Sequence, residues 1–504
     1  MTATPDPDRL PVVVAAGQSI ERADTVTPVD LMARACDELF AEAPGLRDHI
    51  ERLSVVGIMT RGGPAPAREL AERLGIEPAV REVTTAGGNS PQWLVNRAAS
   101  DIAAGELSVT LVAGAEAIRS GRVRHAAGLA PPAEAGTPDP EIGDNLPGWG
   151  PAESAIGLFA PMLVYPLLES VVAAREGRDA PTHRLAMGRL FAPFSEVAAT
   201  NPYAWFPQAW SPEEIATPSP ENRIVCEPYT KRMSAFLGSD QGAALLVCSL
   251  AAAQRAGLAD RAIFVWAGAE ATDVRAPSAR PDLGRSAGIA AAGEALFEAA
   301  RVAAESPVGV DDLELLDLYS CFPSAVELAG DALGIATDDP RGLTVTGGLP
   351  YFGGPGNNYT SHSIATLTER LRRSDDGLGL ATGLGWYVTK HALGLYGRER
   401  PPGGFRRGDT EKAQAAIDAS AVEVALGVEE ATDARIVAAT VVRDSLGAPS
   451  AAPMIVALPD GRRMAVAAAD DETVGAVGAL DVPGLVGGHV VVQPGAARYR
   501  LATP

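Results

Sequence analysis

Basic residues are scarce in this chain of 504 residues, in which 42 Lys and Arg stand against 63 Asp and Glu, a formal net charge of -21. With so little positive charge to neutralise phosphates, we expect no binding to nucleic acid. Cysteine is scarce as well. Cys36, Cys226, Cys248 and Cys321 lie far apart and form no Cys-x-x-Cys pair, which argues against a disulfide framework or a zinc site.

Long apolar runs are also missing. No stretch approaches the roughly 20 consecutive apolar residues of a membrane-spanning helix, so we expect no membrane span. The N-terminal sequence MTATPDPDRLP has neither the basic region nor the apolar region of a signal peptide. Together with unpaired, reduced cysteines, these features predict a cytoplasmic protein.

Apolar strands and helical patterns alternate in two blocks of similar size. Such alternation favours parallel sheets covered by helices on both faces, so the sequence predicts a duplicated α/β fold. The predicted strands are residues 12–16, 53–59, 109–114, 243–248, 263–266 and 313–318, and the clearest predicted helices are 249–256 and 287–305.

The segment between the two blocks, about residues 120–235, has a different texture. It is rich in proline, glycine and aromatic residues, as in LPGWGPAES and NPYAWFPQAWSP, and has little periodicity. This predicts a long loop insertion, which serves either as a lid or substrate-binding segment or as a structural excursion.

After about residue 405, one helical stretch is followed by short apolar runs separated by turn signals, including the hairpin signal Asp460-Gly461. This pattern predicts a small antiparallel β-barrel, similar to an OB fold, appended to the main body. We therefore expect three units: residues 1–240 with the insertion, 241–405, and 406–504.

Five sequence blocks resemble the thiolase superfamily, in its branch related to the sterol-carrier-protein thiolases. Residues 84–106 resemble the nucleophile region, 318–327 the His-Asp-Cys-Phe block, 346–361 the Gly-His-Pro block and 379–388 the Cys-x-Gly block, while 240–249 resembles the end of the first half. The resemblance implies two βαβαβαββ halves layered as α/β/α/β/α. With the C-terminal β-rich unit, the chain is similar to the mycobacterial-type thiolase-like proteins of type 1, which the fold groups with acetyl-CoA acetyltransferases.

The chemical positions of that family are changed. In the register of the resemblance, Gly88 replaces the nucleophilic cysteine, Tyr319 the histidine of the His-Asp-Cys-Phe block, Gly354 the histidine of Gly-His-Pro, and Gly383 the second cysteine. Glycine carries neither a nucleophile nor a titrating group, so we expect no covalent acyl transfer by the thiolase route.

Two residues are candidates for a remaining catalytic role. The Tyr319 phenol can donate a hydrogen bond to a thioester carbonyl, and Cys321 is the one reactive side chain kept in a matching block. Packing in the core is the alternative for both. Ser90 is a candidate nucleophile or substrate contact, but a serine before Pro91 at the start of a helix is also a typical N-cap.

Candidate substrate-binding residues surround the glycine-rich stretch 347–356. They are Tyr351, Asn357, Asn358 and Tyr359, and core or turn packing is the alternative for the tyrosines. Lys231 is a further candidate because a lysine can meet a CoA phosphate; otherwise it is a solvated surface charge.

Three functions remain open on these residues: an acyltransferase-related protein that binds acyl-CoA without thiolase activity, an acyl-CoA aldolase that uses Tyr319, and a non-catalytic binding or scaffold protein of lipid metabolism. No covalent cofactor is expected, and the resemblance implies CoA or an acyl-CoA as ligand. Thiolases dimerise through a strand near the nucleophile. Because TTAGGN is poor strand material, we expect a monomer or a weakened dimer.

Overall fold

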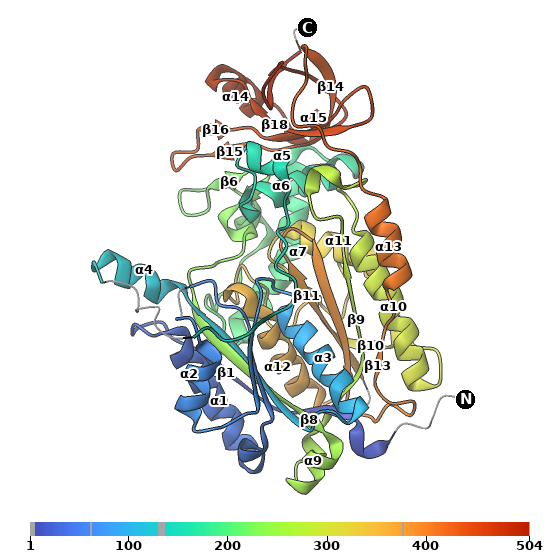
Figure 1. The fold of residues 1–504 in the computed structure, drawn as a ribbon. Helices are drawn as coiled ribbons and strands as arrows, with labels where there is room; N and C mark the ends of the chain where they lie inside the picture. Colours follow the sequence, from blue (N-terminus) through green and yellow to red (C-terminus); the bar gives the residue numbers. More distant parts are fainter. Residues whose placement is uncertain (1–5, 61–62, 130–136, 375–376, 503–504) are drawn as a thin grey trace.

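The computed structural model describes residues 6–60, 63–129, 137–374 and 377–502 (Figure 1). The first half of the body forms a sheet in the order β1-β8-β4-β2-β3-β5, in which β1 and β8 and then β8 and β4 are antiparallel, and β4, β2 and β3 are parallel. These strands are β1 (Pro11–Ile20), β2 (Arg52–Val55), β3 (Val80–Thr84), β4 (Val109–Ala117), β5 (Glu141–Ile142) and β8 (Asp240–Ser249).

The second half repeats this order as β9-β12-β11-β10, with the same two antiparallel pairs followed by a parallel pair. Its strands are β9 (Ile263–Thr272), β10 (Leu313–Asp317), β11 (Leu378–Gly385) and β12 (Lys390–Gly397), and the short β13 (Arg406–Arg407) pairs with β9. Val12 of β1 pairs with Phe264 of β9, which joins the halves into one 11-stranded sheet. The predicted duplication is confirmed.

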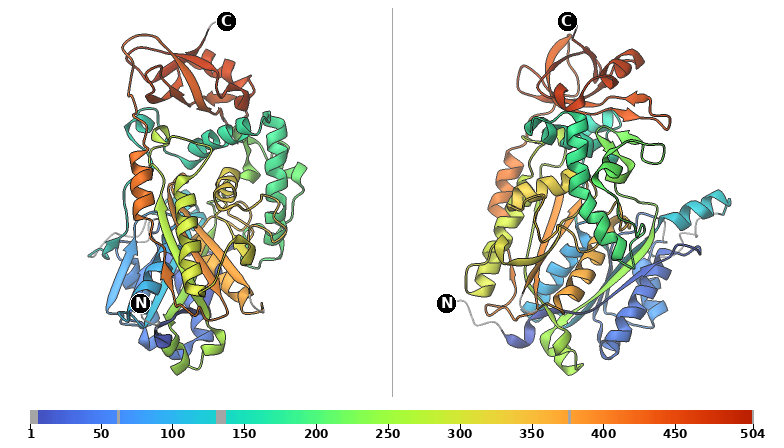
Figure 2. Two further views of the ribbon diagram at one scale, coloured as in Figure 1. Left: turned by 90° about the vertical axis from the view of Figure 1, so that its right-hand side faces the viewer. Right: turned by 180° about the vertical axis from the view of Figure 1, so that it is seen from behind.

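Helices lie on both faces of each half (Figure 2). Helices α3 (Ser90–Ala104) and α12 (Tyr359–Leu371) contact each other and both halves of the sheet, and therefore form the central layer. The outer layers consist of α1 (Pro28–Glu42) and α2 (Pro66–Leu74) on the first half, and of α10 (Ala287–Ala304) and α11 (Pro323–Leu333) on the second.

The alternation of side chains along the strands separates the layers. On β8, Leu245 belongs to the core cluster that contains Leu94 of α3 and Ile364 of α12, whereas its neighbour Leu246 packs in the cluster with Leu39 of α1. Because successive side chains of a strand point to opposite faces, one continuous apolar run supplies both cores.

The expectation of a long loop between residues 120 and 235 is wrong, because about half of this segment is helical. It contains α4 (Ile118–Ala126), α5 (Pro151–Ala155), α6 (Pro161–Arg175), α7 (Ala180–Thr200) and α8 (Pro212–Ala216). Pro166 and Pro193 lie inside α6 and α7 and obscure their helical pattern in the sequence. Asp179 caps α7 by accepting a hydrogen bond from the Thr182 N–H.

The C-terminal unit is a closed barrel in the order β14-β17-β18-β20-β19. Its strands are β14 (Thr432–Ala439), β17 (Met454–Ala457), β18 (Arg463–Ala468), β19 (His489–Val492) and β20 (Arg498–Leu501), with α14 (Asp471–Gly478) and α15 (Val482–Leu485) between β18 and β19. The barrel is confirmed, but it is not wholly antiparallel: β18 and β20 are parallel.

A small second sheet connects the barrel to the body. Strands β15 (Val442–Arg443) and β16 (Pro449–Ala451) of the barrel unit continue into β6 (Ile224–Cys226) and β7 (Tyr229–Thr230) of the insertion. The barrel therefore rests on α6 and the neighbouring insertion elements (Figure 1). The remaining helices are α9 (Leu250–Arg255), which matches the predicted helix at 249–256, and α13 (Glu411–Ala419).

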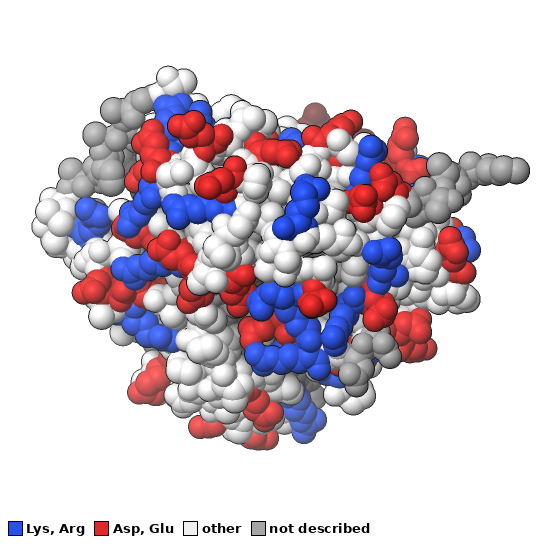
Figure 3. Space-filling model, turned by 90° about the horizontal axis from the view of Figure 1, so that it is seen from below, with Lys and Arg blue, Asp and Glu red and all other residues white. Residues whose placement is uncertain are grey.

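Acidic and basic side chains are intermixed over the face seen from below (Figure 3), so the negative net charge is not gathered into a single patch there. Among the described residues, no helix has the length and apolar character needed to cross a bilayer.

Candidate functional site

Three of the four changed positions meet between the two halves. Gly88 immediately precedes α3, Tyr319 follows β10, and Gly383 lies within β11. The Thr360 hydroxyl of α12 donates a hydrogen bond of 2.9 Å to the Gly88 carbonyl, and the Tyr319 N–H donates one of 2.8 Å to the hydroxyl of Thr382. The structure therefore brings these three positions together.

Tyr319 fills the space in which a side chain at position 88 would lie. A Cβ built on Gly88 would stand 2.8 Å from Cζ of Tyr319, nearer still to its hydroxyl, and 2.5 Å from the Leu384 carbonyl oxygen. Real Cβ atoms do not approach other atoms so closely. The glycine at the nucleophile position and the tyrosine at the histidine position therefore depend on each other.

The other two glycines are enclosed as well. A Cβ on Gly383 would stand 2.9 Å from Cα of Asn89. Gly354 lies apart from Tyr319, against the insertion, where its N–H donates a hydrogen bond of 2.8 Å to the Phe236 carbonyl, and a Cβ there would meet Leu237 at 3.2 Å. Backbone packing occupies the places where the family has histidine and cysteine side chains.

The cavity beside Tyr319 is very small. Its volume is about 10 Å³, and its lining includes Thr382, Gly383, Leu384 and His391. A cavity of this size has room for about one water molecule. In this conformation it cannot admit the acyl group of a thioester.

Both candidate catalytic residues are buried and protonated at neutral pH. Burial raises the pKa of Tyr319 above its usual range, with a smaller contribution from Cys321. Burial also raises the pKa of the Cys321 thiol to about 12. Because the thiolate is the reactive form of cysteine, Cys321 is not poised as a nucleophile. The Tyr319 hydroxyl keeps its proton and remains able to donate a hydrogen bond.

Aromatic side chains of the insertion close the approach to this region. Tyr165 of α6 stacks on Phe322 with ring centroids 4.5 Å apart, and Tyr229 stacks on Phe322 at 5.4 Å. The Tyr165 hydroxyl donates to the Trp386 carbonyl at 2.9 Å and accepts from the Val388 N–H. The insertion therefore packs directly on the loop between β11 and β12.

The two asparagines of the glycine-rich block hold the backbone together. Asn357 accepts a hydrogen bond from the Gly87 N–H at 2.9 Å and donates to the Gly57 carbonyl at 2.7 Å. Asn358 donates to the Gly114 carbonyl at 2.6 Å. These amides are used within the protein, which favours a structural role over substrate binding.

The two tyrosines of that block are part of the core. The Tyr359 hydroxyl lies 2.5 Å from the hydroxyl of Thr346 and 3.3 Å from the buried carboxyl of Asp317. Its ring meets the Tyr319 ring edge to face, with centroids 5.4 Å apart. Tyr351 is fully buried against Trp210, and its hydroxyl has no partner among the described residues.

Ser90 and Lys231 lie outside the cluster of changed positions. Ser90 is the first residue of α3, one position after the N-cap Asn89, and its hydroxyl makes only a 3.4 Å contact with the Thr85 carbonyl. The N-cap expectation is therefore wrong by one residue. Lys231 is exposed on a short 3-10 helix (Lys231–Met233), where its neighbour Arg232 stacks over Trp210.

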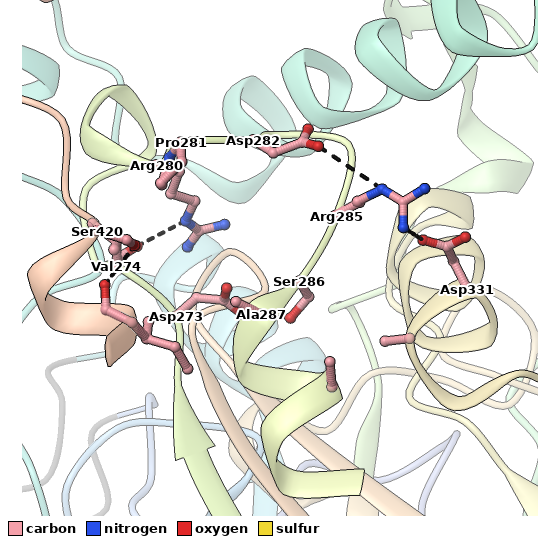
Figure 4. A pocket seen from close by; sticks show the side chains of 13 residues that line it. Asp273, Val274, Arg280, Pro281, Asp282, Arg285, Ser286, Ala287, Asp331 and Ser420 are labelled. Carbon is pink, nitrogen blue, oxygen red and sulfur yellow. Dashed lines mark hydrogen bonds and ion pairs between the residues drawn. The ribbon is translucent and has the colours of Figure 1, made fainter. Parts of the chain in front are cut away.

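A larger cavity, about 420 Å³, opens at the start of α10 (Figure 4). The Ser286 hydroxyl and His391 Nε2 both contact the same oxygen of Asp273, so His391 does not face the serine as the base of a nucleophilic triad does. Arg280 donates to the Tyr387 carbonyl at 2.8 Å, and Arg285 pairs with acidic neighbours. The charged groups of this cavity are satisfied within the protein.

A third cavity, about 370 Å³, lies beside the start of α3 and is lined by Ser90, Lys390 and His391 among others. Lys390 Nζ donates to the carbonyls of Ala86 at 2.7 Å and Asp144 at 3.0 Å, and burial lowers the pKa of this lysine. Neither Lys390 nor His391 is among the site residues predicted from the sequence. Two consecutive basic residues in an otherwise apolar strand were the available signal.

The duplicated halves and the position of the changed residues between them define a thiolase-fold protein. Among solved structures, a monomeric SCP2-thiolase-like protein type 1 from Mycobacterium smegmatis matches with a TM-score of 0.83 and 30% identity, over 99% of this chain and 100% of that one. The chain therefore belongs to the SCP2-thiolase-like proteins of type 1, which confirms the family expected from the sequence.

Two further structures share the fold of the body. The Ltp2-ChsH2(DUF35) aldolase matches with a TM-score of 0.57 and 17% identity, over 77% of this chain and 98% of that one. An acetyl-CoA acetyltransferase from Syntrophomonas wolfei matches with a TM-score of 0.56 and 15% identity, over 77% and 99%. Neither a protein-family model nor a curated protein sequence matches the chain.

Proposed function

We propose that this protein is a non-catalytic member of the thiolase fold, which serves acyl-CoA or lipid metabolism as a binding or scaffold protein. One observation carries the proposal: the Tyr319 ring stands where a side chain at position 88 would have to project. A single substitution at position 88 cannot restore a nucleophile, because the Tyr319 ring occupies the space for its side chain.

The chemistry of the remaining groups supports this proposal. Thiolysis needs a thiolate to carry the acyl group and a second group to move the substrate proton. Gly88 and Gly383 supply neither, and the Cys321 thiol keeps its proton because burial raises its pKa to about 12. The small cavity at Tyr319 and the aromatic packing of Tyr165 on Phe322 further disfavour an acyl group at this centre.

CoA or an acyl-CoA remains the ligand to test first, since the family resemblance implies it. Calorimetric titration of the full chain with CoA and with acetoacetyl-CoA measures binding, and the release of acetyl-CoA measures thiolysis. We expect no thiolysis when CoA and acetoacetyl-CoA are present together. Turnover that depends on a residue of this centre would contradict the proposal, and binding without turnover would identify the ligand.

An aldolase is the second candidate, because Tyr319 places a protonated phenol at the former reaction centre. The structural likeness to the Ltp2-ChsH2(DUF35) aldolase agrees with this candidate in fold. If the protein is an aldolase, the variant Tyr319→Phe should no longer cleave a 3-hydroxyacyl-CoA, whereas Tyr203→Phe should still cleave it. Tyr203→Phe is the control because the hydroxyl of Tyr203 contacts only Glu38 on the surface. Cleavage that follows this pattern would establish the aldolase and overturn the non-catalytic role.

A further inference from the structure

Three ionisable side chains meet beneath the barrel. Glu169 of α6, His183 of α7 and Glu327 of α11 each offer one ligand atom, and these atoms lie within 4.8 Å of one another. Glu169 and His183 are fully buried, and Glu327 is partly buried. We call these three residues the Glu-His-Glu cluster.

Glu169 is the centre of the cluster. Its Oε1 lies 2.5 Å from Nε2 of His183, and its Oε2 accepts a hydrogen bond from the buried hydroxyl of Tyr229. That hydroxyl also lies 2.8 Å from the hydroxyl of Ser324. Tyr229 therefore fixes the orientation of the Glu169 carboxyl, as an outer partner of a metal ligand does.

Glu327 faces the carboxyl of Glu169. Its Oε2 is buried and accepts no hydrogen bond from any residue that the structure describes. No lysine or arginine in the described ranges forms an ion pair with Glu169 or Glu327, although the charges of His183 and Arg178 lower the pKa of Glu327. Burial raises the pKa of both carboxyls, and the neighbouring Glu169 raises that of Glu327 further. Two facing carboxyls without a paired lysine or arginine are unfavourable in a protein interior.

We propose that the Glu-His-Glu cluster is a binding site for a divalent transition-metal cation, with Zn²⁺ as the best match to its donors. One imidazole nitrogen and two carboxylate oxygens form a mixed set that zinc accepts, and the charge of the ion balances both carboxylates. Tetrahedral ligands at zinc distances lie about 3.3 Å apart. The distance between Oε1 of Glu169 and Nε2 of His183, which is 2.5 Å, would therefore increase by less than about 1 Å when zinc binds.

An ion at this place would join three helices that support the barrel. Ser170, the residue after Glu169 on α6, accepts a hydrogen bond of 3.2 Å from the N–H of Ala439 in β14. The cluster thus lies one residue from a contact between the body and the barrel. A bound cation would stabilise the insertion at the place where the barrel rests on it.

Metal binding by the full chain tests the proposal. The purified protein is freed of metal with EDTA, returned to chelator-free buffer and dialysed against ZnCl₂, and its zinc content is measured by mass spectrometry. We expect about one tightly held ion per chain and a higher melting temperature with zinc. His183→Ala and Glu327→Gln should lose both effects. His489→Ala is the matched control, because His489 pairs with Asp433 on the surface.

The two variants and the wild-type chain together show whether the Glu-His-Glu cluster binds the metal. If His183→Ala does not fold, Glu327→Gln answers the question, because the amide keeps the shape of the side chain and loses its charge. Failure of the wild-type chain to bind Zn²⁺ or Mn²⁺ would overturn the proposal and leave the cluster as two carboxyls that share a proton. Zinc binding that survives in Glu327→Gln and His183→Ala would also overturn it.

Discussion

Gly88 and Tyr319 occupy one volume between the two halves, although 231 residues separate them. A tyrosine ring at position 319 leaves no room for a side chain at position 88. The same residues also explain why this region is packed rather than open: the ring fills the space beside Gly88 and leaves only a small cavity. The change of chemistry at this centre is therefore also a change of packing.

Gly88→Ala should destabilise the protein by about 1–3 kcal/mol, because the added methyl group meets Tyr319 and the Leu384 carbonyl. Urea unfolding measures the effect. Gly121→Ala in α4 is the control; its Cβ meets nothing within 4 Å, and alanine favours a helix. The cost should be smaller in a Tyr319→Ala background. An equal cost in both backgrounds would show that the two positions are independent.

At the scale of secondary structure, the pairing of β5 with β3 determines whether an edge of the large sheet is exposed. Strand β5 pairs with the edge of β3, with Val83 opposite Glu141 and Thr84 opposite Ile142. This edge belongs to the nucleophile region through which thiolases dimerise. The two residues of β5 cover the end of this edge, and pairing of this kind is a recognised way of protecting a sheet edge.

We expect a monomer of 52.0 kDa in solution. Light scattering on a size-exclusion column measures the mass over a range of concentrations. A variant in which Glu141 and Ile142 are both replaced by proline should expose the β3 edge and increase association, because proline cannot donate to the ladder. A tight dimer of the unchanged chain at micromolar concentration would contradict this prediction.

The contact of α12 with β1 predicts a dependence of stability on pH. His362 is fully buried, its Nδ1 lies 2.8 Å from Oε1 of Gln18, and burial lowers its pKa to about 3. As the pH falls through about 6.5, His362 therefore binds a proton in the unfolded chain but not in the folded chain. The stability associated with neutral His362 is present above that pH and is lost as the pH falls toward 3, by up to about 1.4 kcal/mol per pH unit.

His362→Gln should reduce this slope, because glutamine does not titrate. Urea unfolding at pH 6 and at pH 4 measures the free energy of unfolding at each pH. The variant His125→Gln, which changes an exposed residue of α4, serves as the control and should keep the slope of the unchanged chain. Identical slopes for His362→Gln and the unchanged chain would contradict the assignment.

At the scale of the whole molecule, the barrel is attached to the insertion by strand pairing and by a buried carboxylate. Glu227 lies 3.0 Å from Arg184 of α7 and 2.9 Å from Arg443 of β15, and its N–H donates to the Val441 carbonyl at 2.8 Å. One carboxylate therefore holds arginines from both units. This arrangement makes the barrel part of the folded body.

Glu227→Gln should destabilise the chain by about 2 kcal/mol, because it leaves two partly buried arginines without their counter-charge. Calorimetric unfolding should show the barrel melting earlier than the body. The control Asp460→Asn removes an exposed partner of Arg462 and should change the melting temperature little. A cooperative transition unchanged in Glu227→Gln would show that strand pairing alone attaches the barrel.

Local patterns in the sequence predicted much of this protein. Apolar runs and their alternation with helices identified the duplicated α/β body, and turn signals identified the barrel, because both depend on neighbours close in sequence. Motif register assigned four chemical positions, Gly88, Tyr319, Gly354 and Gly383, and predicted the loss of thiolase chemistry, but it did not predict that Gly354 packs against the insertion. The helices of the insertion were missed because Pro166 and Pro193 interrupt their pattern.

Only the tertiary structure decided what surrounds these residues. That the Tyr319 ring fills the space at Gly88, that β5 covers β3, and that Glu169, His183 and Glu327 meet are facts about segments distant in the chain. Periodicity reports which face of an element is buried, but not which element packs against that face. The sequence by itself therefore determined the fold and predicted the loss of thiolase chemistry, while packing between distant segments decided which spaces were filled and which charges came together.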